Sequence, residues 1–242
     1  MVENLYISPP FGNYLSYKDA ISVKGTFTWH RRKGLIYHTL RSLRPVSGGW
    51  RNQIGFRNKG IRNVTLNTKD VFSVSAMAKE EWSFLLDYLD MVQYTASTQF
   101  SSINLELNLS CPNVNSITLS PSLLSKFLDK FPLLTVKIRP ETTMNEIEVL
   151  VGTGVKTIHM SNTIGTPKGG ISGRQLKEVN LPMVEKTARL SVNIIAGGGI
   201  YSPSDVIDYR NAGANSFSIS SVLISRPWEL PAIYSEIRSD DS

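Results

Sequence analysis

The sequence predicts a single (β/α)8 barrel, the TIM-barrel fold, over residues 1–242. Eight short β-rich runs are spread along the chain, and helical patterns alternate with them through the second half. Polar or glycine-rich residues follow five consecutive predicted strands. A doubly wound open sheet also fits the alternation. Barrels, however, gather their chemistry on the loops after the carboxyl ends of their strands, so the polar strand ends favour the barrel.

The predicted strands are short runs rich in aliphatic and β-branched residues. In chain order they cover residues 5–7, 25–28, 71–75, 103–109, 134–138, 155–160, 192–196 and 216–220. The run 103–109 shows the pattern clearly, because Ile103, Leu105, Leu107 and Leu109 alternate with other residues. It ends in Ser-Cys-Pro-Asn, which places the only cysteine of the chain, Cys111, at a strand end.

Helical patterns lie between these strands. Residues 80–94 have one apolar face, formed by Trp82, Leu85, Leu86, Leu89 and Val92. Residues 123–131 and 145–152 behave similarly. Residues 201–214 carry both helix ends: Ser202 as the predicted N-cap, Pro203 in the first turn, Asp205 in a capping-box-like position, and Gly213 as the stop. No linker, low-complexity tract or repeat divides the chain, which predicts one domain.

Composition limits the classes of function. The chain has 242 residues, 41% hydrophobic, and no run of about 18 apolar residues; its first ten residues lack both a basic start and an apolar segment. We therefore expect a soluble, unexported, cytoplasmic protein with no membrane partner. The single cysteine excludes an internal disulfide and a cysteine-built zinc site, and three histidines far apart in sequence favour no metal.

The charge of the chain is biased in one segment. The net charge is +6, and residues 24–62 contain many Lys and Arg but no Asp or Glu. Nucleic acid is one conceivable partner for such a strip. The Gly and Asn content of the segment also suits a long ordered loop over a phosphorylated ligand, which is the interpretation we favour over nucleic acid.

The last two predicted strand ends resemble a phosphate site. Gly197, Gly198 and Gly199 leave backbone N–H groups open to an anion, and Ser220 and Ser221 follow the neighbouring strand. In barrels, the loops after strands seven and eight commonly hold phosphate. A tight strand-to-helix turn explains three glycines equally well, but their pairing with a second small-residue strand end favours a ligand.

Several motifs together resemble a known family. The stretches "LELNLSCPNV", "TVKIRP", "SNTIG" with "GGISG", "IIAGGGI" and "NAGANSFSISSVL" are similar, in order and spacing, to dihydroorotate dehydrogenase, a flavin-dependent barrel enzyme of pyrimidine biosynthesis. The cysteine in the "SCPN" loop resembles the soluble class 1 enzymes. "NQIGFRNKG" resembles the substrate segment of the family. The resemblance is strong over residues 103–224 and patchy before them.

This resemblance implies roles for individual residues. Cys111 corresponds to the catalytic base that takes a proton from dihydroorotate while hydride leaves to flavin mononucleotide (FMN). The residues implied in binding the substrate are Asn52, Asn108, Asn113, Asn162 and Thr163. Those implied in binding FMN are Lys137, Gly170, Gly198, Gly199, Ser220 and Ser221. The resemblance also implies a homodimer. A structural role is the ordinary interpretation of a lone buried cysteine, but the four amides matched to the family favour catalysis here.

The chain departs from the family pattern in its first third. The family has a lysine after its second barrel strand, and the matching position is Trp29; Lys24 or Lys33 replaces that lysine only if the register shifts. Two alternatives therefore stay open. One is another FMN-dependent barrel oxidoreductase acting on uracil-like rings, free or in RNA, with the basic segment as its footprint. The other is a non-catalytic flavin-binding remnant. The sequence does not name the electron acceptor.

Overall fold

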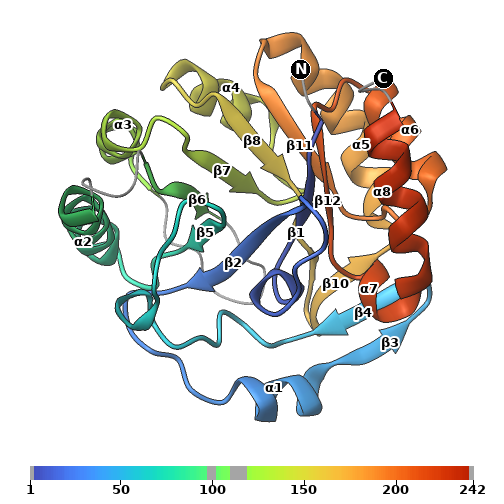
Figure 1. Cartoon of the computed structure of the whole chain (residues 1–242), viewed down its shortest axis with the longest axis horizontal. Coiled ribbons are helices and arrows are strands. Elements are labelled where there is room, and N and C mark those ends of the chain that lie inside the picture. Colours follow the sequence, from blue (N-terminus) through green and yellow to red (C-terminus); the bar gives the residue numbers. More distant parts are fainter. Residues whose placement is uncertain (1–2, 97–101, 110–118, 240–242) are drawn as a thin grey trace.

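The computed structural model of the chain describes residues 3–96, 102–109 and 119–239. Eight parallel strands close into a barrel in the order β1-β12-β11-β8-β7-β6-β5-β2 (Figure 1). The strands are β1 (Leu5–Ile7), β2 (Ile21–Phe27), β5 (Val71–Val74), β6 (Asn104–Asn108), β7 (Thr135–Ile138), β8 (Thr157–Met160), β11 (Asn193–Gly197) and β12 (Ser216–Ile219). The barrel predicted from the sequence is confirmed.

Seven of the eight barrel strands match their predicted ranges closely, and β2 differs. It begins at Ile21, four residues before the predicted start at Gly25. Gly25 lies inside the strand, where the pairing with β5 is irregular between Lys24 and Phe27. Its φ is 117°, and a Cβ there would lie 2.4 Å from the Ser73 carbonyl oxygen. Glycine thus marks the close approach of two strands, not the start of one.

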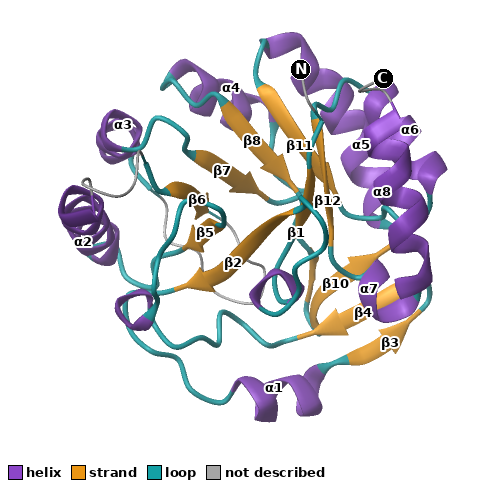
Figure 2. Cartoon of the chain, in the orientation of Figure 1, coloured by secondary structure: helices purple, strands orange, loops and turns teal. Residues whose placement is uncertain are grey.

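Helices surround most of the barrel (Figure 2). They are α2 (Glu81–Ala96), α3 (Pro121–Lys130), α4 (Met144–Gly152), α5 (Leu176–Thr187), α6 (Pro203–Asn211), α7 (Val222–Ser225) and α8 (Leu230–Arg238). The predicted apolar face of α2 is largely buried: Trp82, Leu85 and Leu89 are at most 1% exposed. Within the described residues, no helix is both long and apolar enough to cross a membrane.

The start of α6 differs from the prediction. Ser202 makes no side-chain capping bond to the helix backbone. Instead the Asp205 carboxylate, in the first turn, accepts hydrogen bonds from the Tyr201 N–H (2.9 Å) and the Ser202 hydroxyl (2.8 Å). Ser202 is therefore the N-cap residue, as predicted, but the expected capping bond from its side chain was wrong, because its hydroxyl bonds to the Asp205 carboxylate. Gly213 follows the helix with φ at 99°, as its predicted stop role requires.

The barrel interior is polar on the side of β6. In this strand Leu105 and Leu107 belong to the apolar cluster, while Glu106 and Asn108 between them bond to residues of other barrel strands and loops. All four side chains are buried. The alternation seen in the sequence therefore separates an apolar outer layer from a polar barrel centre.

A second sheet, absent from the sequence-based prediction, lies at the carboxyl end of β8. It is antiparallel in the order β3-β4-β10-β9 and consists of β3 (Arg44–Val46), β4 (Gly49–Asn52), β9 (Ile164–Thr166) and β10 (Gly169–Gly173). Together with α1 (Leu35–Ser42), β3 and β4 occupy part of the basic segment that was predicted as a long loop. The short turns at Gly48 and Pro167 were available signals for the two hairpins.

The barrel flank at β1 and β2 lacks the usual helices. Between these strands, the described chain makes only the 3-10 turn Phe11–Asn13. The next connection contains α1, which has no buried residue and lies apart from the barrel (Figure 1). This part of the barrel wall is therefore covered by irregular chain.

Candidate active site

Two predicted substrate amides meet at the carboxyl end of the barrel. Asn108 is the last residue of β6, and Asn162 follows β8 by two residues. The Asn162 Nδ2 group donates to Asn108 Oδ1 at 3.3 Å, and Asn108 Nδ2 donates to Thr26 Oγ1 at 3.0 Å. The Thr163 N–H donates to Asn162 Oδ1 at 3.0 Å. The sheet thus joins residues from three strand ends into one polar cluster.

Lys137 lies between this cluster and His159. In the ladder it pairs with Asn108 on β6 and with His159 on β8. Its residue is 7% exposed, so the ammonium group stands in a largely enclosed part of the barrel. Burying a cation costs free energy unless an anionic group lies nearby, so we expect a counter-charge beside Lys137.

The counter-charge is Glu106, a residue that the sequence analysis missed. His159 Nδ1 lies 2.5 Å from Glu106 Oε2, and both side chains are at most 1% exposed. Burial would raise the pKa of Glu106, but contacts with His159, Lys137 and Ser73 outweigh it and lower the pKa to about 2. Burial, helped by the nearby charge of Lys137, lowers the pKa of His159. At neutral pH Glu106 is therefore ionised and His159 is neutral, with its Nδ1–H donating to the carboxylate.

The glycine and serine residues form a small cavity at the same end of the barrel. Its volume is about 100 Å³, and its lining includes the predicted cofactor residues Lys137, Gly198, Gly199, Ser220 and Ser221, together with Asn162 and Thr163. This is below the roughly 300–1,000 Å³ of a complete small-molecule site, so the cavity corresponds to one end of a ligand.

The glycine turn has a strict backbone requirement. Gly198 and Gly199 have φ values of 80° and 82°. A Cβ on Gly199 would lie 2.7 Å from the Lys177 backbone nitrogen and 2.8 Å from the Arg174 carbonyl oxygen. Glycine is therefore needed both for the turn and for its packing against the start of α5.

Gly170 and Asn52 lie opposite each other in the small sheet. They are register partners in the antiparallel ladder between β10 and β4. Asn52 Oδ1 accepts a hydrogen bond from the Ile54 N–H at 3.2 Å. Because β9 begins two residues after Asn162, this sheet stands at the carboxyl end of β8, and Asn52 lies at the same end of the barrel as Asn108.

Two predicted site residues, Cys111 and Asn113, lie outside the described residues. The position matched to the family lysine is described. Trp29 packs against Phe84 and Tyr88 of α2, with ring centroids 5.7 and 5.8 Å apart. Lys24 and Lys33 line a cavity on the barrel flank, away from the amide cluster. Neither lysine lines the small cavity that contains Lys137 and Asn162.

His159 is fully buried, and Glu106 is its hydrogen-bond partner across the barrel. Glu106 itself had a usable signal, because it occupies a position of β6 that faces the same way as Asn108. Among the residues that the structure describes, no group of three or more His, Cys, Asp or Glu side chains is arranged to hold a metal ion.

A comparison with protein families decides the classification. The model of the family described as dihydroorotate dehydrogenase matches residues 19–240. The chain belongs to the dihydroorotate dehydrogenase family. The resemblance noted in the sequence motifs is therefore confirmed at the level of the family.

Curated members of the dihydroorotate dehydrogenase family align with most of the chain. The catalytic subunit of dihydroorotate dehydrogenase B (NAD(+)) from Staphylococcus carnosus is 27% identical over 220 residues, covering 79% of this chain and 72% of the relative. The subunit of the same name from Porphyromonas gingivalis is 29% identical over 251 residues, covering 88% and 80%. The ligand-free DHODH structure from Eimeria tenella has a TM-score of 0.64 at 20% identity, covering 89% of this chain and 76% of that one. This structural likeness supports the barrel fold.

Proposed function

We propose that this member of the dihydroorotate dehydrogenase family oxidises dihydroorotate to orotate with FMN as its cofactor. The observation that carries the proposal is the position of Lys137. It stands beside the Asn108–Asn162 amide pair and lines the same cavity as Gly198, Gly199, Ser220 and Ser221. Lys137 therefore lies between the amide cluster and the cavity lined by the glycine and serine residues.

The donor groups of the small cavity fit the phosphate and the anionic ring edge of FMN. Backbone N–H groups at Gly198 and Gly199, and groups of Ser220 and Ser221, would hold the phosphate. Lys137 would lie by the pyrimidine edge of the flavin, where a cation stabilises negative charge, and Gly170 would line the ring. Bound FMN supplies the hydride acceptor.

The amide side chains suit a planar ring with alternating donors and acceptors. Each Asn offers two N–H donors and a carbonyl acceptor without adding charge. We assign the substrate to Asn52, Asn108, Asn113, Asn162 and Thr163. These residues would orient the substrate ring, because its reacting carbons must face the base on one side and the flavin on the other.

Cys111 is proposed as the base that removes the proton. A thiol has a reference pKa of about 8.5, so only a small fraction is thiolate at neutral pH, and activity should rise with pH. By resemblance to the family we also propose a homodimer that acts in the cytoplasm on this small-molecule substrate.

The test is a visible spectrum of the purified protein followed by anaerobic addition of dihydroorotate. A flavin spectrum that bleaches on addition supports the proposal. A folded protein that stays colourless after incubation with FMN and shows no thermal shift contradicts it. Reoxidation is then followed with NAD(+), which the names of the relatives specify, and with fumarate.

A second candidate function is favoured by the side chain of Trp29, which stands where the family has a lysine. The loss of that cation suits a different ring, so a reductase of uracil-like rings, free or in RNA, is the alternative. Orotate binding separates the two. A flavin-loaded protein that does not bind orotate but, after chemical reduction of its flavin with dithionite, is reoxidised by a uracil derivative supports the alternative.

A further inference from the structure

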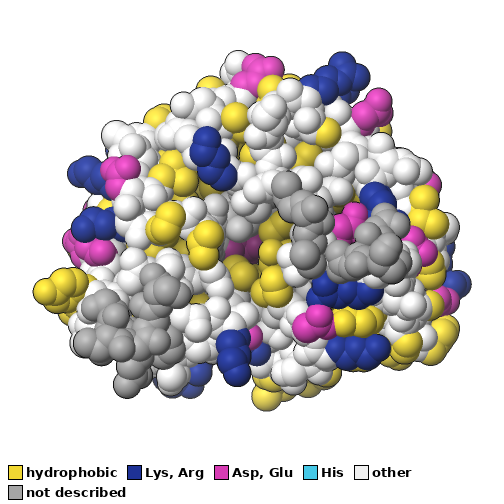
Figure 3. Space-filling model, turned by 45° about the horizontal axis from the view of Figure 1, so that its top comes forward, with side chains coloured by type: hydrophobic (Ala, Val, Ile, Leu, Met, Phe, Trp, Pro, Cys, Tyr) yellow, Lys and Arg dark blue, Asp and Glu magenta, His cyan; other side chains and the backbone are white. Residues whose placement is uncertain are grey.

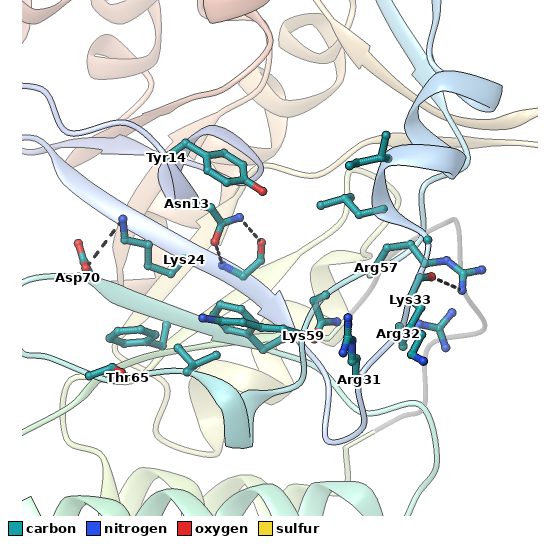
Figure 4. Close-up of a pocket in the computed structure, with 18 of the residues that line it drawn as sticks. Asn13, Tyr14, Lys24, Arg31, Arg32, Lys33, Arg57, Lys59, Thr65 and Asp70 are labelled. Atoms are coloured by element: carbon teal, nitrogen blue, oxygen red, sulfur yellow. Dashed lines mark hydrogen bonds and ion pairs between the residues drawn. The ribbon is translucent and has the colours of Figure 1, made fainter.

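A second cavity lies on the flank of the barrel where the covering helices are missing. Its volume is about 780 Å³, and it is bounded by β2, β5 and the segment around α1 (Figure 4). From the barrel wall it is lined by Lys24, Phe27 and Phe72 of β2 and β5. It shares no lining residue with the small cavity at the carboxyl end of the barrel.

The charge around this cavity is strongly one-sided. Its lining contains six cationic residues, Lys24, Arg31, Arg32, Lys33, Arg57 and Lys59, and one acid, Asp70. Asp70 is already engaged, because its carboxylate lies 3.9 Å from Lys24 Nζ and accepts a hydrogen bond from Asn67 at 2.8 Å. In Figure 4 the other five cations gather at one end of the cavity, away from the Lys24–Asp70 pair.

The backbone holds these cations together. Arg32 and Asn58 form an antiparallel bridge, with N–H to carbonyl distances of 2.9 and 3.0 Å in the two directions. The bridge places residues 31–33 beside residues 57–59. The Asn58 side chain braces the arrangement with four further hydrogen bonds, to the backbone and hydroxyl of Thr28, to Phe56 and to Gly60.

Such an arrangement has an electrostatic cost. Like charges held together repel, and the repulsion is relieved when an anion lies between them. The Arg57 guanidinium also has a donor that an anion could satisfy. Its Nη1 donates to the Lys33 carbonyl at 3.3 Å, while its buried Nε has no hydrogen-bond partner among the described residues. On the face in Figure 3, by contrast, Lys and Arg stand among Asp and Glu.

Apart from the charged residues and the polar Asn13, Asn58 and Thr65, the cavity is lined by glycine and by apolar or aromatic residues. Phe27, Phe72 and Val64 form its wall on the barrel side, and Leu35 and Tyr37 of α1 lie on the other side. The volume is within the usual range for a complete small molecule. Cations concentrated at one end and apolar walls elsewhere describe an elongated ligand with an anionic group and an apolar or planar body.

We propose that this flank cavity binds a phosphorylated small molecule of nucleotide size, with its phosphates among Arg31, Arg32, Lys33, Arg57 and Lys59. The body of the ligand would lie along the apolar wall toward Tyr14. The site is separate from the proposed flavin site and does not depend on the proposed function.

The test is isothermal titration calorimetry with ADP and with inorganic pyrophosphate, on protein incubated with excess FMN so that a flavin phosphate site is filled. Both probes should bind, and both should bind more weakly as salt increases. Lys59→Glu and Arg31→Glu, at exposed side chains, should each weaken both probes about tenfold or more. Tyr14→Ala should weaken ADP but leave pyrophosphate unchanged.

The matched control is Arg189→Glu, an equal charge change at an exposed position outside the cavity. It should leave both affinities unchanged. If Arg189→Glu and Lys59→Glu lose affinity for the probes equally, the binding is a diffuse attraction to the net charge of the protein, and the proposal is overturned. No binding of either probe at millimolar concentration would also overturn it. The proposal would also be overturned if the protein does not bind ADP but binds a single-stranded oligonucleotide tightly, and the same substitutions weaken that binding. If Lys59→Glu does not fold, Lys59→Gln replaces it, with a smaller loss expected.

Discussion

His159 Nδ1 and Glu106 Oε2 lie 2.5 Å apart in the barrel interior, and Lys137 is the register partner of His159 on the neighbouring strand. The three groups act as one electrostatic unit, since the charge of Lys137 lowers the pKa of both partners. We therefore expect these three groups to determine much of how the stability of the protein depends on pH.

The unit predicts two steps of acid destabilisation. The folded pKa of Glu106, about 2, lies below its ordinary value of 4.5, so the unfolded chain takes up a proton first as pH falls. Its contribution, on the order of 3 kcal/mol, is present above pH 4.5 and is lost between pH 4.5 and 2. His159 also has a lowered folded pKa, so a further loss begins as pH falls below 6.5. Urea unfolding from pH 7 to pH 2 measures both losses of stability.

Glu106→Gln tests the assignment. The variant should lose about 3–5 kcal/mol at pH 7, because Lys137 is left without its counter-charge. It should also lack the decline between pH 4.5 and 2. An unchanged acid profile would mean that another carboxylate dominates that window.

Lys137→Met should abolish or strongly reduce FMN retention, measured as the flavin-to-protein ratio after desalting. The cation that would stabilise the flavin edge is gone, a loss of about tenfold or more in affinity. Lys156→Met is the matched control, since Lys156 is exposed and precedes β8 at the other end of the barrel.

The double variant Lys137→Met/Glu106→Gln separates stability from cofactor binding. Removing both charges should restore much of the stability lost in either single variant. FMN retention should stay low. If retention recovers together with stability, Lys137 acts only as a partner of Glu106.

Gly199→Ala should destabilise the turn by about 1–3 kcal/mol and lower FMN affinity. The φ of 82° disfavours a side chain, and the added Cβ would collide with the start of α5. Gly152→Ala is the control, because a Cβ there meets nothing within 4 Å. Thermal unfolding and flavin titration of the two variants give the comparison; equal behaviour would contradict a special role for the turn.

Cys111→Ser should slow flavin reduction by dihydroorotate by about two orders of magnitude or more, while FMN and orotate still bind. Serine preserves size and polarity but ionises far less readily than a thiol. The residual rate should recover at higher pH. Stopped-flow bleaching across pH measures this, and an unchanged rate in the variant would remove the thiol from the chemistry.

Much of the barrel follows from local patterns in the sequence. Alternation in 103–109 and apolar runs such as 192–196 gave strands within a few residues of those observed. The small antiparallel sheet was missed because β3 and β9 are three residues long and β10 is Gly-Gly-Ile-Ser-Gly, so this part of the sequence shows no aliphatic or β-branched run. The side-chain role of Ser202 was misassigned because its hydroxyl bonds to the Asp205 carboxylate, a contact that sequence spacing does not show.

The candidate site was predictable where residues follow strand ends. The resemblance to the family named Asn108, Lys137 and Asn162, the barrel fold predicted that strand ends meet at one mouth, and the three residues lie together. The alternation puts Glu106 on the same face of β6 as Asn108, but the sequence does not show which residue that face meets across the barrel. A charge at that position has meaning only once His159, 53 residues away, is brought into contact with it.

The pairing of β1 with both β2 and β12 has a consequence for how the chain is made. The first strand finds one neighbour early, but its other neighbour is Ser216–Ile219, more than 200 residues later. Contacts this distant in sequence form slowly and late. During synthesis, β1 and β11 therefore remain open sheet edges around a polar interior until residue 219 has left the ribosome. Open edges recruit other chains, so the growing polypeptide should depend on chaperones, and fragments that stop before β12 should aggregate.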